Sequence, residues 1–142
     1  MLKKVRIHII SENISPSDGT AERTEYAPEG HVRADAERFS LSYRETDASG
    51  MEGCRTVLSF LTSAPEVLYL SRTGSVNTHL TFEAGQTVTS AYEAPLVSFD
   101  VETETHRVRN RLREDGSLEL DYTVRPAGTE PSEIRFRLEF RE

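Results

Sequence analysis

The sequence has 142 residues, of which 36% are hydrophobic and 29% are charged, and a chain of this kind can bury a core of its own. Its formal net charge of −7 disfavours non-specific binding to nucleic acids and to anionic membranes. Cys54 is the only cysteine in the sequence, which excludes an intrachain disulfide. We expect a single domain over residues 1–142.

The first residues, MLKKVRIHIISEN, combine a basic start with an apolar stretch. Arg6 and His8 interrupt this stretch and no small-residue cleavage site follows, so we do not expect a signal peptide. The most apolar window, residues 56–70, contains Pro65 and Glu66 and is too short to cross a bilayer. These features predict a cytoplasmic protein that does not associate with membranes.

Hydrophobic and polar residues alternate in nearly every segment of the chain. Residues 5–9, 38–45, 117–124 and 133–142 each place apolar side chains on one face and mostly polar side chains on the other. A period of two predicts half-buried antiparallel strands. No comparable stretch has helical spacing, so the sequence predicts an all-β fold.

Two glycine-containing turns predict how neighbouring strands align. A three-residue loop at 83–85, with Gly85 in the left-handed conformation, would pair Leu80 with Val88. Residues 112–118 allow a two-residue turn that sets Arg113 opposite Leu118, or a three-residue loop at 114–116 that sets Leu112 opposite Leu118. We favour the second because a slip of one residue exchanges the two faces of a strand.

Pro95 interrupts the stretch AYEAPLVSFDV at residues 91–101. The inward positions are even-numbered through Tyr92 and odd-numbered from Val97, so the register changes at this point. Proline has no N–H to donate, which predicts a corner where one strand ends. The parity changes again before Val108, and this predicts a bulge between Thr103 and His106.

Roughly eight to ten short strands joined by tight turns indicate a barrel or a sandwich. Both terminal segments alternate cleanly and would be exposed edges in an open sheet, so we expect the barrel to be closed or nearly closed.

The chain resembles the YwiB-like family, small bacterial proteins of unknown function. The resemblance covers nearly the whole length, in the segments VRIHIISE (5–12), FSLSYRE (39–45), LYLSRTGSVNTHLTFEAG (68–85), AYEAPLVSFDVETET (91–105) and GSLELDYTV (116–124). At the corner, the family pattern has threonine before the proline and glycine two residues after it, where this sequence has Ala94 and Val97. The resemblance implies a calycin-like or lipocalin-like antiparallel β-barrel and implies no activity.

Two charged residues occupy inward positions. Glu45 follows Phe39, Leu41 and Tyr43 on the apolar face of its segment, and Arg72 follows Leu68 and Leu70 in the same way. A buried charge is costly unless it is paired, so the two residues are expected to meet inside the barrel. Arg72 would supply parallel donors to a carboxylate, either that of Glu45 or one on a ligand.

The resulting hypothesis is a ligand site inside the barrel. Its candidate residues are Tyr43, Glu45, Arg72, Tyr92 and Tyr122, with Tyr26 as a further source of a hydroxyl group. The alternative is that Glu45 and Arg72 form a structural pair or reach water at the strand ends.

The sequence indicates no metal, cofactor or nucleophile site. The four histidines, His8, His31, His79 and His106, are scattered, and we expect surface imidazoles. Cys54 and Ser11 lie at strand ends without the context of a nucleophile elbow, and residues 72–77 lack the glycine spacing and lysine of a P-loop.

Two runs of alternating arginines line one face of a strand each. These are Arg107, Arg109, Arg111 and Arg113 in the first run, and Arg135, Arg137 and Arg141 in the second. They are open to two interpretations: a surface that binds a phosphate backbone or an acidic protein, or cross-strand pairing with Glu119, Asp121 and Glu139. We favour the pairing.

Three hypotheses about function follow. The first is a barrel that binds a small amphipathic molecule, with Arg72 and Glu45 at its polar end. The second is a protein-interaction module, for instance a homodimer, with a filled interior. The third is an enzyme, and it has the least support because no nucleophile and base pair can be identified. No nucleic-acid partner is expected.

Overall fold

A computed structural model describes residues 2–142 of the chain, which form eleven β-strands and one short 3-10 helix. The elements are β1 (Leu2–Ile14), β2 (Ala21–Tyr26), β3 (Glu29–Ala34), β4 (Arg38–Arg44), η1 (Asp47–Ser49), β5 (Arg55–Leu61), β6 (Val67–Thr73), β7 (Asn77–Glu83), β8 (Thr87–Ala94), β9 (Val97–Arg111), β10 (Ser117–Pro126) and β11 (Ser132–Arg141). None of the described helices is long and apolar enough to cross a membrane.

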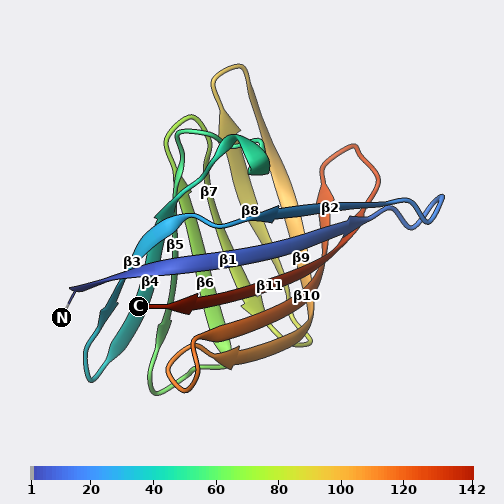
Figure 1. Cartoon of the computed structure of the whole chain (residues 1–142). Helices are drawn as coiled ribbons and strands as arrows, with labels where there is room; N and C mark the ends of the chain where they lie inside the picture. Colours follow the sequence, from blue (N-terminus) through green and yellow to red (C-terminus); the bar gives the residue numbers. More distant parts are fainter. Residues whose placement is uncertain (1) are drawn as a thin grey trace.

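The strands form a closed antiparallel barrel (Figure 1). The order runs from β11 through β10, β9 and so on to β4, β3 and β1, and β1 pairs with β11 to complete the circle. β2 is an additional strand that pairs with the C-terminal half of β1, while β3 pairs with its N-terminal half. The predicted all-β barrel is therefore confirmed, with ten strands in the closed wall and one outside it.

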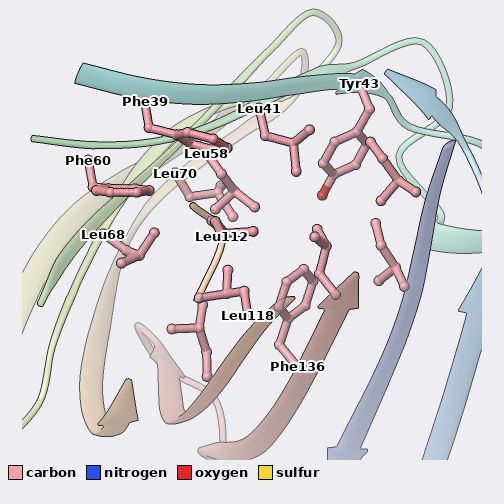
Figure 2. Close-up of a cluster of buried hydrophobic side chains, with 14 of the residues drawn as sticks. Phe39, Leu41, Tyr43, Leu58, Phe60, Leu68, Leu70, Leu112, Leu118 and Phe136 are labelled. Atoms are coloured by element: carbon pink, nitrogen blue, oxygen red, sulfur yellow. The ribbon is translucent and has the colours of Figure 1, made fainter. Parts of the chain in front are cut away.

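The alternation of the sequence determines which side chains fill the barrel. Leu41, Leu58, Leu68, Phe82 and Leu118 are at most 1% exposed and belong to one continuous core. Figure 2 shows the buried side chains of this core converging from several strands. The hydrophobic effect of burying them is the main stabilising contribution, because each large apolar side chain removed from water contributes about 1.5–3 kcal/mol.

Pro95 lies at a corner, as predicted. It occupies the two-residue turn with Leu96, and Ala94 pairs with Val97 on the other side of that turn. The predicted bulge is also confirmed, because Asp121 pairs with Arg107 while the next residue pairs with Thr105, which leaves His106 as the extra residue.

Both predicted registers for the 112–118 turn are wrong. Leu118 pairs with Asn110, and residues 112–116 form a longer turn in which three successive amides donate to the carbonyl of Arg111. Asn110 lies two positions before Leu112, so the inward face is preserved and Leu112 stays 2% exposed within the turn.

The predicted pairing of Leu80 with Val88 is also wrong, although Gly85 has the predicted left-handed conformation with φ of +83°. The turn bonds to β9 instead: the Gly85 amide donates to the Thr105 carbonyl, and the Thr105 amide donates to Gln86. As a result β7 and β8 share only the pairs Asn77–Glu93 and Thr78–Tyr92 among the described residues.

Candidate functional site

A row of inward-facing residues crosses the barrel wall near one end. Tyr43 pairs with Thr56, Thr56 with Arg72, Arg72 with Thr78, and Thr78 with Tyr92. Residues directly opposite each other on antiparallel strands point to the same face of the sheet. Register alone therefore brings side chains from β4, β5, β6, β7 and β8 to one level of the interior.

Glu45 and Arg72 meet at this level, which confirms that the two inward charges are neighbours. The Arg72 Nε donates to Glu45 Oε2 at 3.4 Å, and the carboxylate is fully buried while 17% of the Arg72 side chain is exposed. Glu45 also accepts hydrogen bonds from the hydroxyls of Thr56 and, at 2.8 Å, of Tyr26. The Glu45 carboxylate is thus well satisfied, and it holds the guanidinium of Arg72 in position.

Several polar groups in the barrel interior are not used up by the protein. Within residues 2–142, the terminal nitrogens of Arg72 make no hydrogen bond, and the buried hydroxyls of Tyr43, Thr103 and Thr105 have no partner at hydrogen-bond distance. The Tyr43 hydroxyl has that of Tyr26 as a more distant polar neighbour. In Figure 2 the Tyr43 hydroxyl points into the barrel. Thr103 and Thr105 are on β9, which the strand order places across the barrel from β4. Buried hydroxyls normally have a partner, so these three groups need an explanation.

The electrostatics keep the tyrosines neutral and the arginine charged. Burial first, and then the charge of Glu45, raises the pKa of both Tyr43 and Tyr26 well above the ordinary value. Burial by itself lowers the pKa of Arg72, but the neighbouring Tyr43 and Glu45 raise it above its ordinary value. The centre therefore offers hydroxyl donors and a permanent cation.

The structure separates the predicted site residues into two groups. Tyr43, Glu45 and Arg72 lie together, joined by Tyr26. Tyr122 contacts Phe82 with the rings tilted by 54° and their centroids 4.7 Å apart, and Tyr92 stacks on Phe99 at 4.8 Å. Tyr122 is half-buried, and the desolvation of its hydroxyl raises its pKa, although the charge of Arg72 acts in the opposite direction. Of these two tyrosines, only Tyr122 is linked electrostatically to Arg72 in the described interactions.

The polar residues Thr56, Thr103 and Thr105 were missed in the sequence. Their inward parity was the available signal, because each alternates with exposed residues on its strand. Threonine is common on both faces of strands, so parity alone did not single them out.

A separate apolar hollow lies at the opposite end of the barrel. It has a volume of about 340 Å³ and is lined mainly by core residues such as Val5, Val32, Phe39 and Leu112. Glu45 and Arg72 do not line it, so the polar centre and this hollow are distinct.

The favoured interpretation of the arginine runs is confirmed for three of the seven arginines, Arg107, Arg109 and Arg137, whereas Arg111 pairs with Asp115 in the adjoining turn. Glu119 lies within 3.6 Å of Arg107, 3.4 Å of Arg109 and 3.1 Å of Arg137. Asp121 accepts a hydrogen bond from Arg137 at 2.9 Å. Glu139 differs from the expectation, since its recorded ionic neighbour is the imidazole of His8 at 3.8 Å.

The remaining candidates for chemistry do not form a site. Cys54 is fully buried, with its Sγ 3.4 Å from the hydroxyl of Ser75. No group of three potential metal ligands occurs among the described residues.

Fold and interior together define the class of protein: a closed antiparallel β-barrel whose core is apolar except for a charged centre near one end. The chain belongs to the family described as a domain of unknown function, DUF1934, whose model matches residues 7–138. No curated protein matches the chain.

The barrel is similar to a solved structure, the crystal structure of the ywiB protein from Bacillus subtilis. The two share 17% sequence identity with a TM-score of 0.76, and the match covers 99% of this chain and 94% of the other. The likeness shows the fold.

Proposed function

We propose that the barrel binds a small molecule at the end that carries the charged centre, and that Arg72 donates hydrogen bonds to an anionic or strongly polar group on it. Glu45 positions Arg72, and Tyr43 supplies a neutral hydroxyl donor. An apolar part of the molecule would pack near the Phe82–Tyr122 pair, which is consistent with an amphipathic ligand.

The observation that carries this proposal is the set of unused polar groups. Three buried hydroxyls and the outer nitrogens of Arg72 have no hydrogen-bond partner among residues 2–142. Leaving a buried hydroxyl unsatisfied costs roughly 1–3 kcal/mol, so a purely structural centre gains nothing from keeping the three hydroxyls. A bound molecule with several acceptors would satisfy groups on both walls.

Native mass spectrometry of the protein purified from a bacterial host tests the proposal first. The expected result is an additional mass under gentle conditions that leaves on activation. A Tyr43→Phe variant should lose most of this mass and remain folded, because the substitution removes one hydroxyl whose polar neighbour in the protein, Tyr26, keeps its own bond to Glu45.

Tyr69→Phe is the matched control, since Tyr69 is 45% exposed on the outside of the wall. It should retain the mass. The proposal is wrong, and the centre is structural, if neither wild type nor Tyr43→Phe carries an additional mass and the variant has a free energy of unfolding about 1 kcal/mol higher than wild type.

A protein-interaction module is the second candidate, and the β8–β9 turn favours it. Leu96 is 99% exposed and Val97 is 52% exposed at the tip of a hairpin that projects from the barrel (Figure 1). A dimer in the same mass spectra, lost on Leu96→Ser, would support this alternative.

A further inference from the structure

A second hollow lies on the outside of the barrel, over β1, β3, β4 and β5. Its volume is about 440 Å³. The residues that line it are Lys4, Glu29, Gly30, His31, Ser42, Tyr43, Arg44 and Arg55. Its single carboxylate, on Glu29, lies 3.2 Å from the ammonium of Lys4. The two arginines are therefore not neutralised by the acid in the hollow.

Arg44 and Arg55 lie directly opposite each other in the β4–β5 ladder. Like charges in this position repel and destabilise the sheet. Neither arginine has an ion-pair partner among residues 2–142. A sheet that keeps such a pair, on a chain with a net charge of −7, retains a local cost that a bound anion would remove.

The outer face of β4 supplies hydroxyls and no carboxylate to this hollow. The outward residues of β4 between its two ends are Ser40 and Ser42, and Ser40 pairs with Ser59 of β5. Ser42 lies opposite His31 of β3, next to the arginine pair. Hydroxyl and guanidinium groups are both donors to oxygen anions.

We propose that this hollow binds a phosphate group through Arg44 and Arg55, with Lys4 and the Ser42 hydroxyl as additional donors. Two guanidinium forks match the several oxygens and the double charge of a phosphate better than the single charge of a carboxylate. The phosphate is either free or carried by a small molecule. The proposal does not depend on the interior site, because Arg44 and Arg55 are exposed on the outer surface.

Thermal unfolding with sodium pyrophosphate, at constant ionic strength adjusted with sodium chloride, tests the proposal. A ligand that binds only the folded state raises Tm with its concentration. We expect this for wild type, and we expect Arg44→Gln and Arg55→Gln each to weaken the apparent affinity by about tenfold or more. Without pyrophosphate, both variants should be at least as stable as wild type, because the repulsion is gone.

Arg135→Gln is the matched control: Arg135 is exposed on β11 and has no recorded ion pair. It should respond to pyrophosphate as wild type does. The proposal is wrong if wild type does not respond, if Arg44→Gln responds equally, or if Arg135→Gln loses as much affinity as Arg44→Gln.

Amide chemical shifts locate the site and identify the form of phosphate. Pyrophosphate should perturb the amides of His31, Ser42, Arg44 and Arg55 more than those of β9–β11, and the reverse pattern would overturn the assignment. Inorganic phosphate and adenosine monophosphate are then compared. Equal affinities indicate recognition of free phosphate, and tighter binding of the monophosphate ester indicates that a small molecule carries it.

Discussion

The outer faces of β3–β5 and of β9–β11 both carry arginines on a barrel wall, but their environments are opposite. On β9–β11, the strand between the two arginine runs supplies Glu119 and Asp121, and these acids contact Arg107, Arg109 and Arg137. On β4 and β5, the position facing Arg44 is Arg55. On β9–β11 the arginines nearest β10 are paired with acids, whereas on β4 and β5 the two facing arginines have no acid partner in the described part of the chain.

This difference shows that the spacing of arginines along a strand does not determine their role. What matters is the residue that the neighbouring strand places opposite each one, and that depends on register. The run from Arg107 to Arg113 is conspicuous in the sequence, yet it contains arginines that stabilise the wall. The pair Arg44–Arg55 is separated by a loop in the sequence and is the stronger candidate for binding.

Removing Glu119, the acid shared by three arginines, should have the largest effect on the stability of the protein. Glu119 is 28% exposed and contacts three arginines, so Glu119→Gln should lower the free energy of unfolding by about 1–2 kcal/mol. Urea unfolding measures the loss. The variant should also become sensitive to pyrophosphate on this face.

Glu102→Gln on β9 serves as the control, because Glu102 is exposed and has no recorded ion pair. It should change stability little. An equal loss in both variants would mean that net charge, and not the local network, is responsible.

Introducing an acid into the cationic pair should have a smaller effect in the opposite direction. Arg55→Glu replaces a like-charge pair with an opposite-charge pair facing Arg44, and a gain of about 0.5 kcal/mol is expected. The urea midpoint should rise while the response to pyrophosphate disappears. Destabilisation by Arg55→Glu would show that Arg44 and Arg55 do not repel in the folded protein.

Added salt should have the smallest effect on stability, and the effect should have opposite signs for variants of the two faces. Raising sodium chloride from about 0.01 M to about 1 M shortens the Debye length from roughly 30 Å to roughly 3 Å. At high salt, the loss in free energy of unfolding caused by Glu119→Gln should shrink by about 0.2–0.5 kcal/mol. The gain caused by Arg55→Glu should shrink by a similar amount. Two shifts of the same sign would contradict the electrostatic account of the two faces.

The sequence was sufficient to predict the barrel and the meeting of its interior charges. Alternation identifies the inward positions of Glu45 and Arg72, and the register of the consecutive strands β4, β5 and β6 brings them together. Pro95 marks a corner because its missing N–H cannot serve a ladder. These predictions succeed because each depends on a local rule.

The predictions that failed depend on choices that local rules do not decide. Leu112 is buried in a five-residue turn whose amides converge on one carbonyl, and several turn lengths satisfy the same alternation. The pairing of Arg44 with Arg55 depends on the exact register across the 45–54 loop. Their outward parity was visible in the sequence, but their alignment was not.

The long strand β1 also has a consequence for how the protein is made. β1 forms nine pairs with β11, and Lys3 bonds to Glu142, 139 positions away. During synthesis, β1 leaves the ribosome well before β11 exists, so one edge of the nascent sheet stays unpaired for most of translation. Contacts of such long range also slow folding. We expect closure of the barrel to be its last folding step, and incomplete chains that lack β11 to aggregate through the open edge of β1.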